Sequence, residues 1–328
     1  MMRIRATIGL MLAPLMLGAQ SPGALTAADL ETLRGYDARL ATIAYRLTTA
    51  NVALCTDRAP TPGWALHALD QYPPESRTLA RQVFGFAAPV GVEAVVAGGP
   101  AARADVRADD ALVAVGGRPM PQPGAEAGSA TRDAALAMVA AEPAGAPLAV
   151  TLRRGGTTRT VTTAASPGCR SAFEVLLGPN MDARADGQIV QIGVRFFERY
   201  GDDQIAAVVA HELSHNILRH RARLEAAGVK RGLLAEVGRN RRLFRRTEEE
   251  ADLLSVALLR NAGYDPLAAA RFWREHGGDV DGGFFRSRTH PSSRFRAEAI
   301  KAAVARIPAD AGPVYRPAVL ATRDQPLS

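Results

Sequence analysis

The spacing of apolar residues along the chain predicts a long helix, then a β-rich segment, then a mainly helical segment. Residues 27–55 carry apolar side chains at the three- and four-residue spacing of an amphipathic helix. Between residues 84 and 166, short apolar pairs alternate with Gly and Pro turns, and a Gly-Gly hairpin signal lies at 155–156. One helical stretch, near 131–141, interrupts these strands. The middle of the chain is therefore predicted to be a small β-rich module.

From Ser171 onward the pattern predicts strands followed by helices. The segments FEVLLG and QIVQIGVRFF have the composition of strands. The segment DDQIAAVVAHELSHNILRH (202–220) has helical spacing, with Asp202 or Asp203 as its capping residue. A second helix is predicted within 245–266. The fold class predicted for the whole chain is α+β.

The N-terminal residues have the layout of a secretory signal peptide. Arg3 and Arg5 precede an apolar run from Ile8 to Leu17, and the small residue Ala19 offers a cleavage site. The run is shorter than the roughly 20 residues needed to span a bilayer, and no cysteine stands at the cleavage point for lipid attachment. We therefore expect residues 1–19 to be removed, leaving a periplasmic chain with no stable transmembrane segment.

Composition, cysteine count and charge add three expectations. With 47% apolar and 22% charged residues, the chain has the make-up of a globular protein. In an oxidising compartment Cys55 and Cys169 could form a disulfide, the alternative being two unrelated buried thiols. The net charge of +7 is concentrated between Arg219 and Arg246, in a segment with few aromatic residues and no groove-reading motif. The segment is therefore expected to be a solvated basic loop or helix, with an active-site lid or a contact for an anionic partner as alternatives. Its sequence argues against binding of nucleic acid.

The segment HELSH at 211–215 is the strongest chemical signal. His211 and His215 are four residues apart, so on a helix they project from one face about one turn apart. Zinc suits such a pair, because a catalytic zinc takes three protein ligands and keeps a fourth position for water. Glu212 would accept the proton of that water as it attacks a carbonyl. The pattern predicts metal-assisted hydrolysis of a peptide bond.

The third ligand is expected from a distant helix. A metzincin-type continuation is excluded because Leu218 and Arg221 stand where Gly and His are needed, and His220 is one place short. The predicted second helix carries Glu248 and Asp252 four apart on one face. Asp252 is placed to accept the free ring N–H of a zinc-bound histidine.

The motifs HELSH, E-x-x-A-D (248–252), AGYDP and THPSSRFR resemble the M48 family of zinc metallopeptidases. The resemblance implies a mainly helical, gluzincin-type domain with a small β-sheet and one Zn²⁺ per chain. It assigns the third ligand to Glu248, with Glu249 as second choice. It also places His290 close to the active site, as an oxyanion-stabilising group or a gate over the metal. Arg296, six residues later, is the other candidate for stabilising the oxyanion.

The β-rich module resembles a PDZ domain of the bacterial protease type. The resemblance is carried by FGFA (84–87), by residues 91–120 and by the LAVTLRRGG strand, and it departs at Asp105 and at Asp109-Asp110. It implies that an extended peptide adds to a sheet edge, while the backbone amides of Phe84, Gly85, Phe86 and Ala87 capture a terminal carboxylate. The alternative is a small β-domain that only spaces or shields its neighbour.

These observations predict a PDZ-like domain inserted into a peptidase domain. The expected boundaries are a signal peptide at 1–19, an N-terminal helical part of the peptidase domain at 20–80, the PDZ-like domain at 81–166 and the zinc metallopeptidase catalytic domain at 167–328. The resemblance implies an endopeptidase for envelope protein quality control, acting on unfolded or misassembled proteins whose termini the PDZ-like domain recruits. The alternative function is a peptide-binding module or holdase with a gated or inactive metal site.

Overall fold

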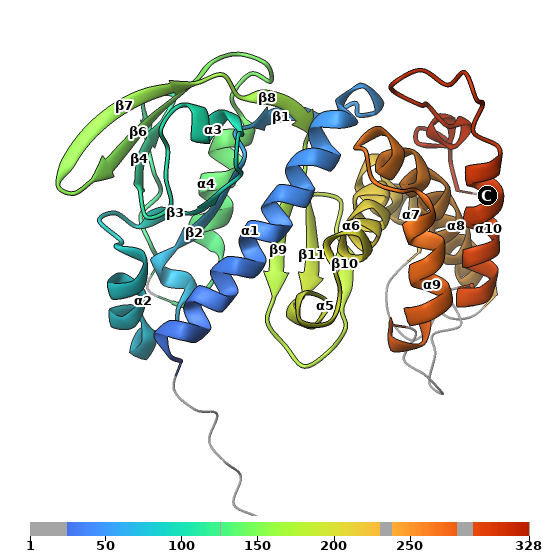
Figure 1. The fold of residues 1–328 in the computed structure, drawn as a ribbon, viewed down its shortest axis with the longest axis horizontal. Helices are drawn as coiled ribbons and strands as arrows, with labels where there is room; N and C mark the ends of the chain where they lie inside the picture. The colour runs from blue at the N-terminus through green and yellow to red at the C-terminus, as the bar shows by residue number, and fades with distance from the viewer. Residues whose placement is uncertain (1–24, 125, 230–237, 281–290, 328) are drawn as a thin grey trace, which may run out of the picture.

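The computed structural model describes residues 25–124, 126–229, 238–280 and 291–327 (Figure 1). Helix α1 (Ala27–Ala50) crosses the middle of the molecule, with a β-rich part on one side and a helical part on the other. The predicted α+β class is confirmed. None of the helices within the described ranges has the length and apolar composition that a membrane crossing requires.

Helix α1 is held at both ends by side-chain hydrogen bonds. Thr26 and Asp29 form a reciprocal capping box, in which the Thr26 backbone N–H donates to the Asp29 carboxylate at 2.9 Å. At the other end, the Asn51 side-chain amide donates to the carbonyl oxygens of Leu47 and Leu258, at 2.9 and 3.0 Å. The predicted helix therefore ends earlier than residue 55, and its end is tied to the helical part of the molecule.

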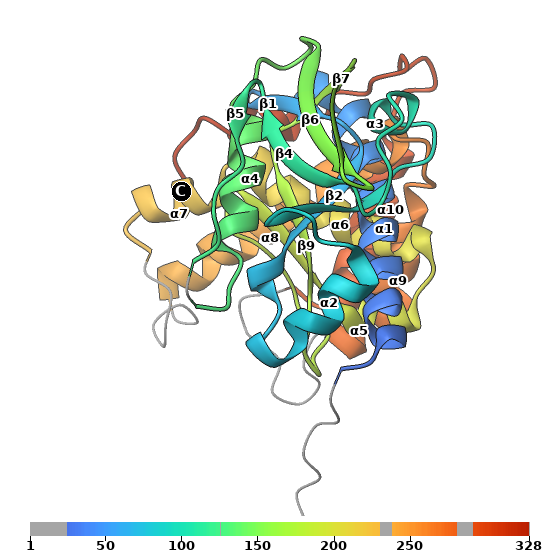
Figure 2. The ribbon, with the colours of Figure 1, turned by 90° about the vertical axis from the view of Figure 1, so that its left-hand side faces the viewer.

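The β-rich part is an antiparallel sheet in the order β2-β3-β4-β6-β7, with β5 paired to β4 (Figure 2). Its apolar side chains form a separate core cluster. The hairpin between β6 and β7 turns at Gly155 and Gly156, which both adopt positive φ, as a two-residue turn between twisted strands requires. The elements are β2 (Trp64–Ala68), α2 (Arg77–Phe84), β3 (Val90–Val95), α3 (Pro100–Arg103), β4 (Ala111–Val115), β5 (Arg118–Pro119), α4 (Ala130–Ala140), β6 (Leu148–Arg154) and β7 (Thr157–Thr163).

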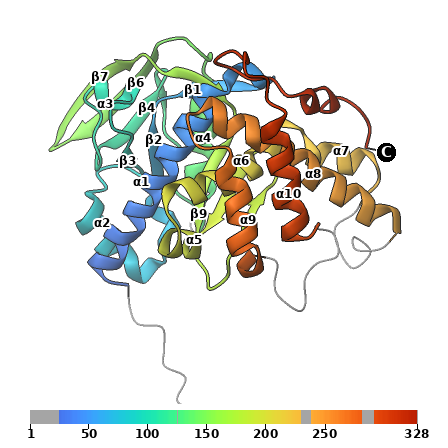
Figure 3. The ribbon, with the colours of Figure 1, turned by 45° about the vertical axis from the view of Figure 1, so that its right-hand side comes forward.

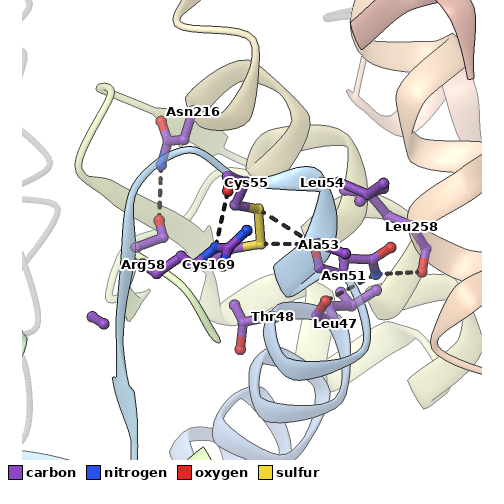
Figure 4. The surroundings of a disulfide bond; sticks show 12 residues. Leu47, Thr48, Asn51, Ala53, Leu54, Cys55, Arg58, Cys169, Asn216 and Leu258 are labelled. Atoms are coloured by element: carbon purple, nitrogen blue, oxygen red, sulfur yellow. Dashed lines mark hydrogen bonds between the residues drawn. A yellow bond between two sulfur atoms is a disulfide. The ribbon is translucent and has the colours of Figure 1, made fainter. Parts of the chain in front are cut away.

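The two ends of the β-rich part meet at a disulfide between Cys55 and Cys169 (Figure 4). Beside it, β1 (Arg58–Thr61) pairs antiparallel with β8 (Ser166–Cys169). The chain thus leaves and re-enters the rest of the molecule at one place. A second sheet follows, in the order β10-β11-β9, from β9 (Ala172–Leu176), β10 (Ala183–Ala185) and β11 (Ile189–Gly193).

The helical part packs around α6, which lies in the largest core cluster of the described residues (Figure 3). Helix α6 contacts α8 and α9, and α10 packs across both of these helices. The helices are α5 (Val194–Arg199), α6 (Asp202–Ile217), α7 (His220–Ala226), α8 (Gly238–Asn261), α9 (Leu267–Val280) and α10 (Ser293–Ala305), followed by the 3-10 turn η6 (Ala318–Thr322).

Charged side chains join the β-rich part to α1 and to the second sheet. Arg132 of α4 donates to the Glu174 carboxylate of β9 at 2.5 Å. Asp37 of α1 lies among these groups and accepts a hydrogen bond from the backbone of Val175. Because the groups come from three elements, their charge states contribute to the contact between the two parts of the molecule.

Three local predictions need correction. The strand predicted over 188–197 ends at Gly193, because burial of Phe196 and Phe197 against the core favours helix α5. The cap of α6 is Gly201, whose N–H is satisfied by the Gln204 side chain at 3.0 Å, so Asp202 and Asp203 lie in the first turn near the positive end of the helix dipole. The sheet of the β-rich part also begins at β2, before the boundary predicted at residue 81.

Candidate metal centre

Helices α6 and α8 bring three metal-ligating side chains together. The Nε2 atoms of His211 and His215 are 3.2 Å apart. The Glu248 carboxylate lies 3.3 Å from Nε2 of His211 and 3.5 Å from Nε2 of His215. Zinc ligands at about 2.0–2.1 Å in a tetrahedron stand roughly 3.3 Å from one another. The donor atoms and their spacing therefore fit a tetrahedral zinc ion with one position left for water.

Asp252, the residue expected from the sequence to orient a zinc-bound histidine, lies beside His211. The Asp252 carboxylate lies 3.0 Å from Nδ1 of His211. Because a carboxylate can only accept, Nδ1 carries a proton, and Nε2 is the ring atom that faces the other ligands and would bind a metal. Without a metal, burial and Arg296 lower the pKa of His211, but hydrogen bonds to Asp252 and Glu248 outweigh them and raise it to about 9, so a bound metal would displace the Nε2 proton.

The orientation of His215 is set by a second chain of hydrogen bonds. Nδ1 of His220 lies 2.9 Å from Nδ1 of His215, and Nε2 of His220 lies 3.1 Å from the Glu250 carboxylate. Burial lowers the pKa of His220, so its ring is neutral and carries one proton. Since Glu250 accepts that proton, Nδ1 of His220 accepts from His215, and Nε2 of His215 is left to bind metal.

Glu250 is in turn held by arginines of the basic segment. Arg223 donates to its carboxylate at 2.6 Å and Arg246 donates at 3.0 Å. Burial raises the pKa of Glu250, but hydrogen bonds from His220, Arg223 and Arg246 outweigh burial and hold the pKa well below its usual range. Part of the 219–246 segment is therefore structural rather than solvated, and its residues 230–237 lie outside the described ranges. The sequence analysis did not predict that His220 and Glu250 support His215. The signals for it were a histidine five residues after His215 and a third glutamate in the acidic triplet.

Arg296 of α10 lies among the same side chains. It is 2% exposed, and its guanidinium donates to both oxygens of Asp252, at 2.6 and 2.8 Å. It also lies 3.4 Å from the centre of the Trp273 ring and 3.7 Å from the Glu248 carboxylate. Burial raises the pKa of Asp252, but Arg296 and His211 outweigh burial and lower it. These contacts support a positioning role for Arg296, while its action on an oxyanion stays a prediction.

The remaining predicted residues of this site are placed as follows. Glu212 follows His211 on α6 and is half-buried, at about 100° around the helix from it. Glu249, the second choice for the third ligand, is exposed, whereas Glu248 is buried against the histidines. His290 lies outside the described residues.

The predicted carboxylate loop is packed against β2. Phe84 is the last residue of α2, and Gly85 ends that helix in the left-handed conformation with φ of 61°. The Phe86 ring lies 4.3 Å from the His67 ring of β2, and the Ala87 carbonyl accepts from Arg153 at 3.2 Å. Carboxylate capture by this loop stays a prediction, and the aromatic side chains at its start face the chain's own β2.

Known proteins match both parts of the chain. Residues 159–304 match the model of peptidase family M48, and residues 91–154 match the model of the PDZ domain. The chain is 30% identical over 122 residues to the mitochondrial metalloendopeptidase OMA1 of Schizosaccharomyces pombe. The aligned stretch covers 31% of this chain and 36% of that protein. The chain thus spans about a third of that relative's length.

Among solved structures, the HtrA3 PDZ domain bound to a phage-derived ligand (FGRWV) is matched at 20% identity with a TM-score of 0.24, over 34% of this chain and 88% of that chain. The family and the PDZ domain predicted from the sequence are both confirmed by the family models. Residues 159–304 thus match peptidase family M48, and the PDZ match at residues 91–154 precedes them in the chain.

Proposed function

We propose that the chain is a zinc-dependent endopeptidase that holds its metal through His211, His215 and Glu248. The observation that carries the proposal is that one donor atom from each of these three side chains lies within 4.8 Å of the other two. The Nδ1 atom of each histidine has a separate hydrogen-bond partner. When bound, zinc supplies Lewis acidity toward a carbonyl oxygen and lowers the pKa of its water to about 7.

The protein's own residues would do the rest of the chemistry. Glu212 is the general base: it takes a proton from the attacking water and delivers it to the leaving amine. Asp252 and His220 keep the two histidines in the tautomer that leaves Nε2 unprotonated. Arg296 keeps Asp252 ionised and fixed in place. His290 and Arg296 remain the candidates for stabilising the tetrahedral intermediate.

For the substrate, we propose unfolded or misassembled proteins of the cell envelope, met in the periplasm. Two observations support an oxidising, extracytoplasmic location: the signal-like pattern of residues 1–19 and the disulfide between Cys55 and Cys169. A peptide-bond hydrolase in that compartment fits the quality-control role implied by the family resemblance.

The test compares the zinc-loaded chain with Glu212→Gln and Glu249→Gln, using casein as an unfolded substrate and measuring bound metal in each protein. Glu212→Gln is expected to keep its zinc and to lose activity by roughly 10²- to 10⁴-fold, the contribution of a positioned general base. Glu249→Gln is the matched control, because it removes an exposed carboxylate next to a proposed ligand, and it should retain activity.

The alternative function is a peptide-binding module or holdase. It would be favoured if wild type and Glu212→Gln both bound zinc, bound casein and left it uncut. Loss of zinc in Glu248→Gln would then still support the ligand set, so the metal assignment and the catalytic assignment are tested separately.

A further inference from the structure

Strand β2 lies outside the residues that match the PDZ model, yet it belongs to the PDZ sheet. The match begins at residue 91, within β3, whereas β2 is Trp64–Ala68. The two strands pair antiparallel from Trp64 opposite Val95 to Ala68 opposite Val90. On its other side β3 pairs with β4. The edge of β3 that would otherwise be open is therefore taken by a segment of the same chain.

The position and direction of β2 are those of a bound peptide. PDZ domains bind an extended peptide as an added strand on a sheet edge. The predicted carboxylate loop, residues 84–87, ends two residues before β3 begins, so a captured terminal carboxylate would lie near the start of β3. A peptide with its C-terminus there runs antiparallel to β3. Strand β2 does the same, since its last residue, Ala68, lies opposite Val90, the first residue of β3.

The side chains of β2 are buried as a ligand's would be. Leu66 is 6% exposed and Ala68 is fully buried, and both join the core cluster that contains Ala135 and Val139 of α4. Helix α4 packs on both β2 and β3. The His67 ring contacts the Phe84 ring edge-on and the Phe86 ring at a tilt, with ring centres 4.8 and 4.3 Å apart.

The residues that follow β2 hold it in place. Thr131 of α4 donates its hydroxyl to the Asp70 carboxylate at 2.5 Å, and the Gly128 N–H donates to the Asp70 carbonyl at 2.9 Å. The Leu69 N–H donates to the Pro89 carbonyl at 3.0 Å, in line with the β2–β3 ladder. A peptide would end at this point, but the chain continues, so no terminal carboxylate is present.

We propose that β2 is a built-in ligand that fills the peptide groove of the PDZ domain, so that a peptide from another chain enters only where β2 gives way. The segment also defines the class of competing ligand: an extended peptide with a large apolar side chain at the Leu66 position and a small residue at the Ala68 position. The proposal does not depend on peptidase activity, because it concerns only the β-rich part.

The probe is a fluorescein-labelled pentapeptide of the β2 sequence, WALHA, with a free C-terminal carboxylate, and its binding is measured by fluorescence anisotropy. The full chain is compared with Leu66→Ala, which empties the position that the peptide's leucine would fill. Leu254→Ala is the matched control, because it truncates an equally buried leucine in the helical core. Trp64→Ala, at the half-buried start of β2, is a milder second variant should Leu66→Ala fail to fold.

We expect no saturable binding to wild type or Leu254→Ala, and at least tenfold tighter binding to the β2 variants. In those variants the probe should also slow hydrogen exchange of the β3 amides. Binding to wild type within threefold of the β2 variants would overturn the proposal, because the groove would then be open. Absence of binding to folded β2 variants, or equal binding to Leu254→Ala, would overturn it as well.

Discussion

Replacing both cysteines should destabilise the chain by several kcal/mol without touching the metal centre. The disulfide links residues 114 apart and encloses the whole β-rich part (Figures 1 and 4). Both cysteines are buried in the core beside the Asn51 backbone, at the end of α1. The variant Cys55→Ala/Cys169→Ala removes the cross-link while leaving small apolar side chains in that core.

The magnitude follows from the loop that the bond closes. In the chain-entropy model, closing a loop of this length lowers the entropy of the unfolded chain by about 16 cal/mol/K, which is about 4.8 kcal/mol at 25 °C. Whole domains are stable by only about 5–15 kcal/mol. The variant should therefore retain its fold at low temperature and lose a large fraction of its free energy of unfolding.

Urea unfolding followed by circular dichroism and tryptophan fluorescence measures this difference. The variant should show a lower midpoint and a larger m-value, because its unfolded chain exposes more surface. Wild type with its disulfide reduced serves as the control and should unfold like the variant. A difference below about 1 kcal/mol between oxidised wild type and the variant would refute the reasoning, since the cross-link would then not restrict the unfolded chain.

Three further predictions follow from the site and from the contact between the two parts of the molecule. Asp252→Asn should weaken zinc binding by about 10- to 100-fold, because an amide can also donate a hydrogen bond and so no longer fixes the proton of His211 on Nδ1. Competition with a chelator measures the zinc affinity, and an unchanged affinity would contradict the role assigned to Asp252. His220→Ala should weaken zinc binding by a similar factor through His215, and an effect on folding alone, with zinc affinity intact, would count against the hydrogen-bond chain. Burial raises the pKa of Asp37 to about 7, so the folded state keeps a proton that the unfolded state releases near pH 4. This stability is full below pH 4 and is lost as pH rises toward 7, by on the order of 3–4 kcal/mol. Asp37→Asn should flatten the dependence in urea titrations, and an equally steep slope in the variant would exclude this carboxyl as its source.

Local pattern alone determined the elements that carry the chemistry. Helical spacing is a short-range property, so the four-residue separation of His211 and His215 predicts their common face without knowledge of the rest of the fold. The same holds for α1, for α4 and for the Gly-Gly hairpin, which depend on side-chain periodicity and on backbone conformations that glycine adopts. Glu248 was predicted as a ligand only from a family motif, because the local sequence pattern does not indicate which distant helix packs against α6.

Only the tertiary structure decided which side chains complete the site and which strand closes the sheet. The hydrogen bonds from Glu250 through His220 to His215 join α8, α7 and α6, and their partners are set by how those helices pack. Strand β2 is five residues long, mostly apolar but with His67 within it, and shows no clear alternation, so its pattern does not say which sheet edge it joins. Its place beside β3 follows from the free edge and from burial of Leu66 and Ala68 in the PDZ core. Such pairings depend on long-range geometry, and spacing along the chain does not encode it.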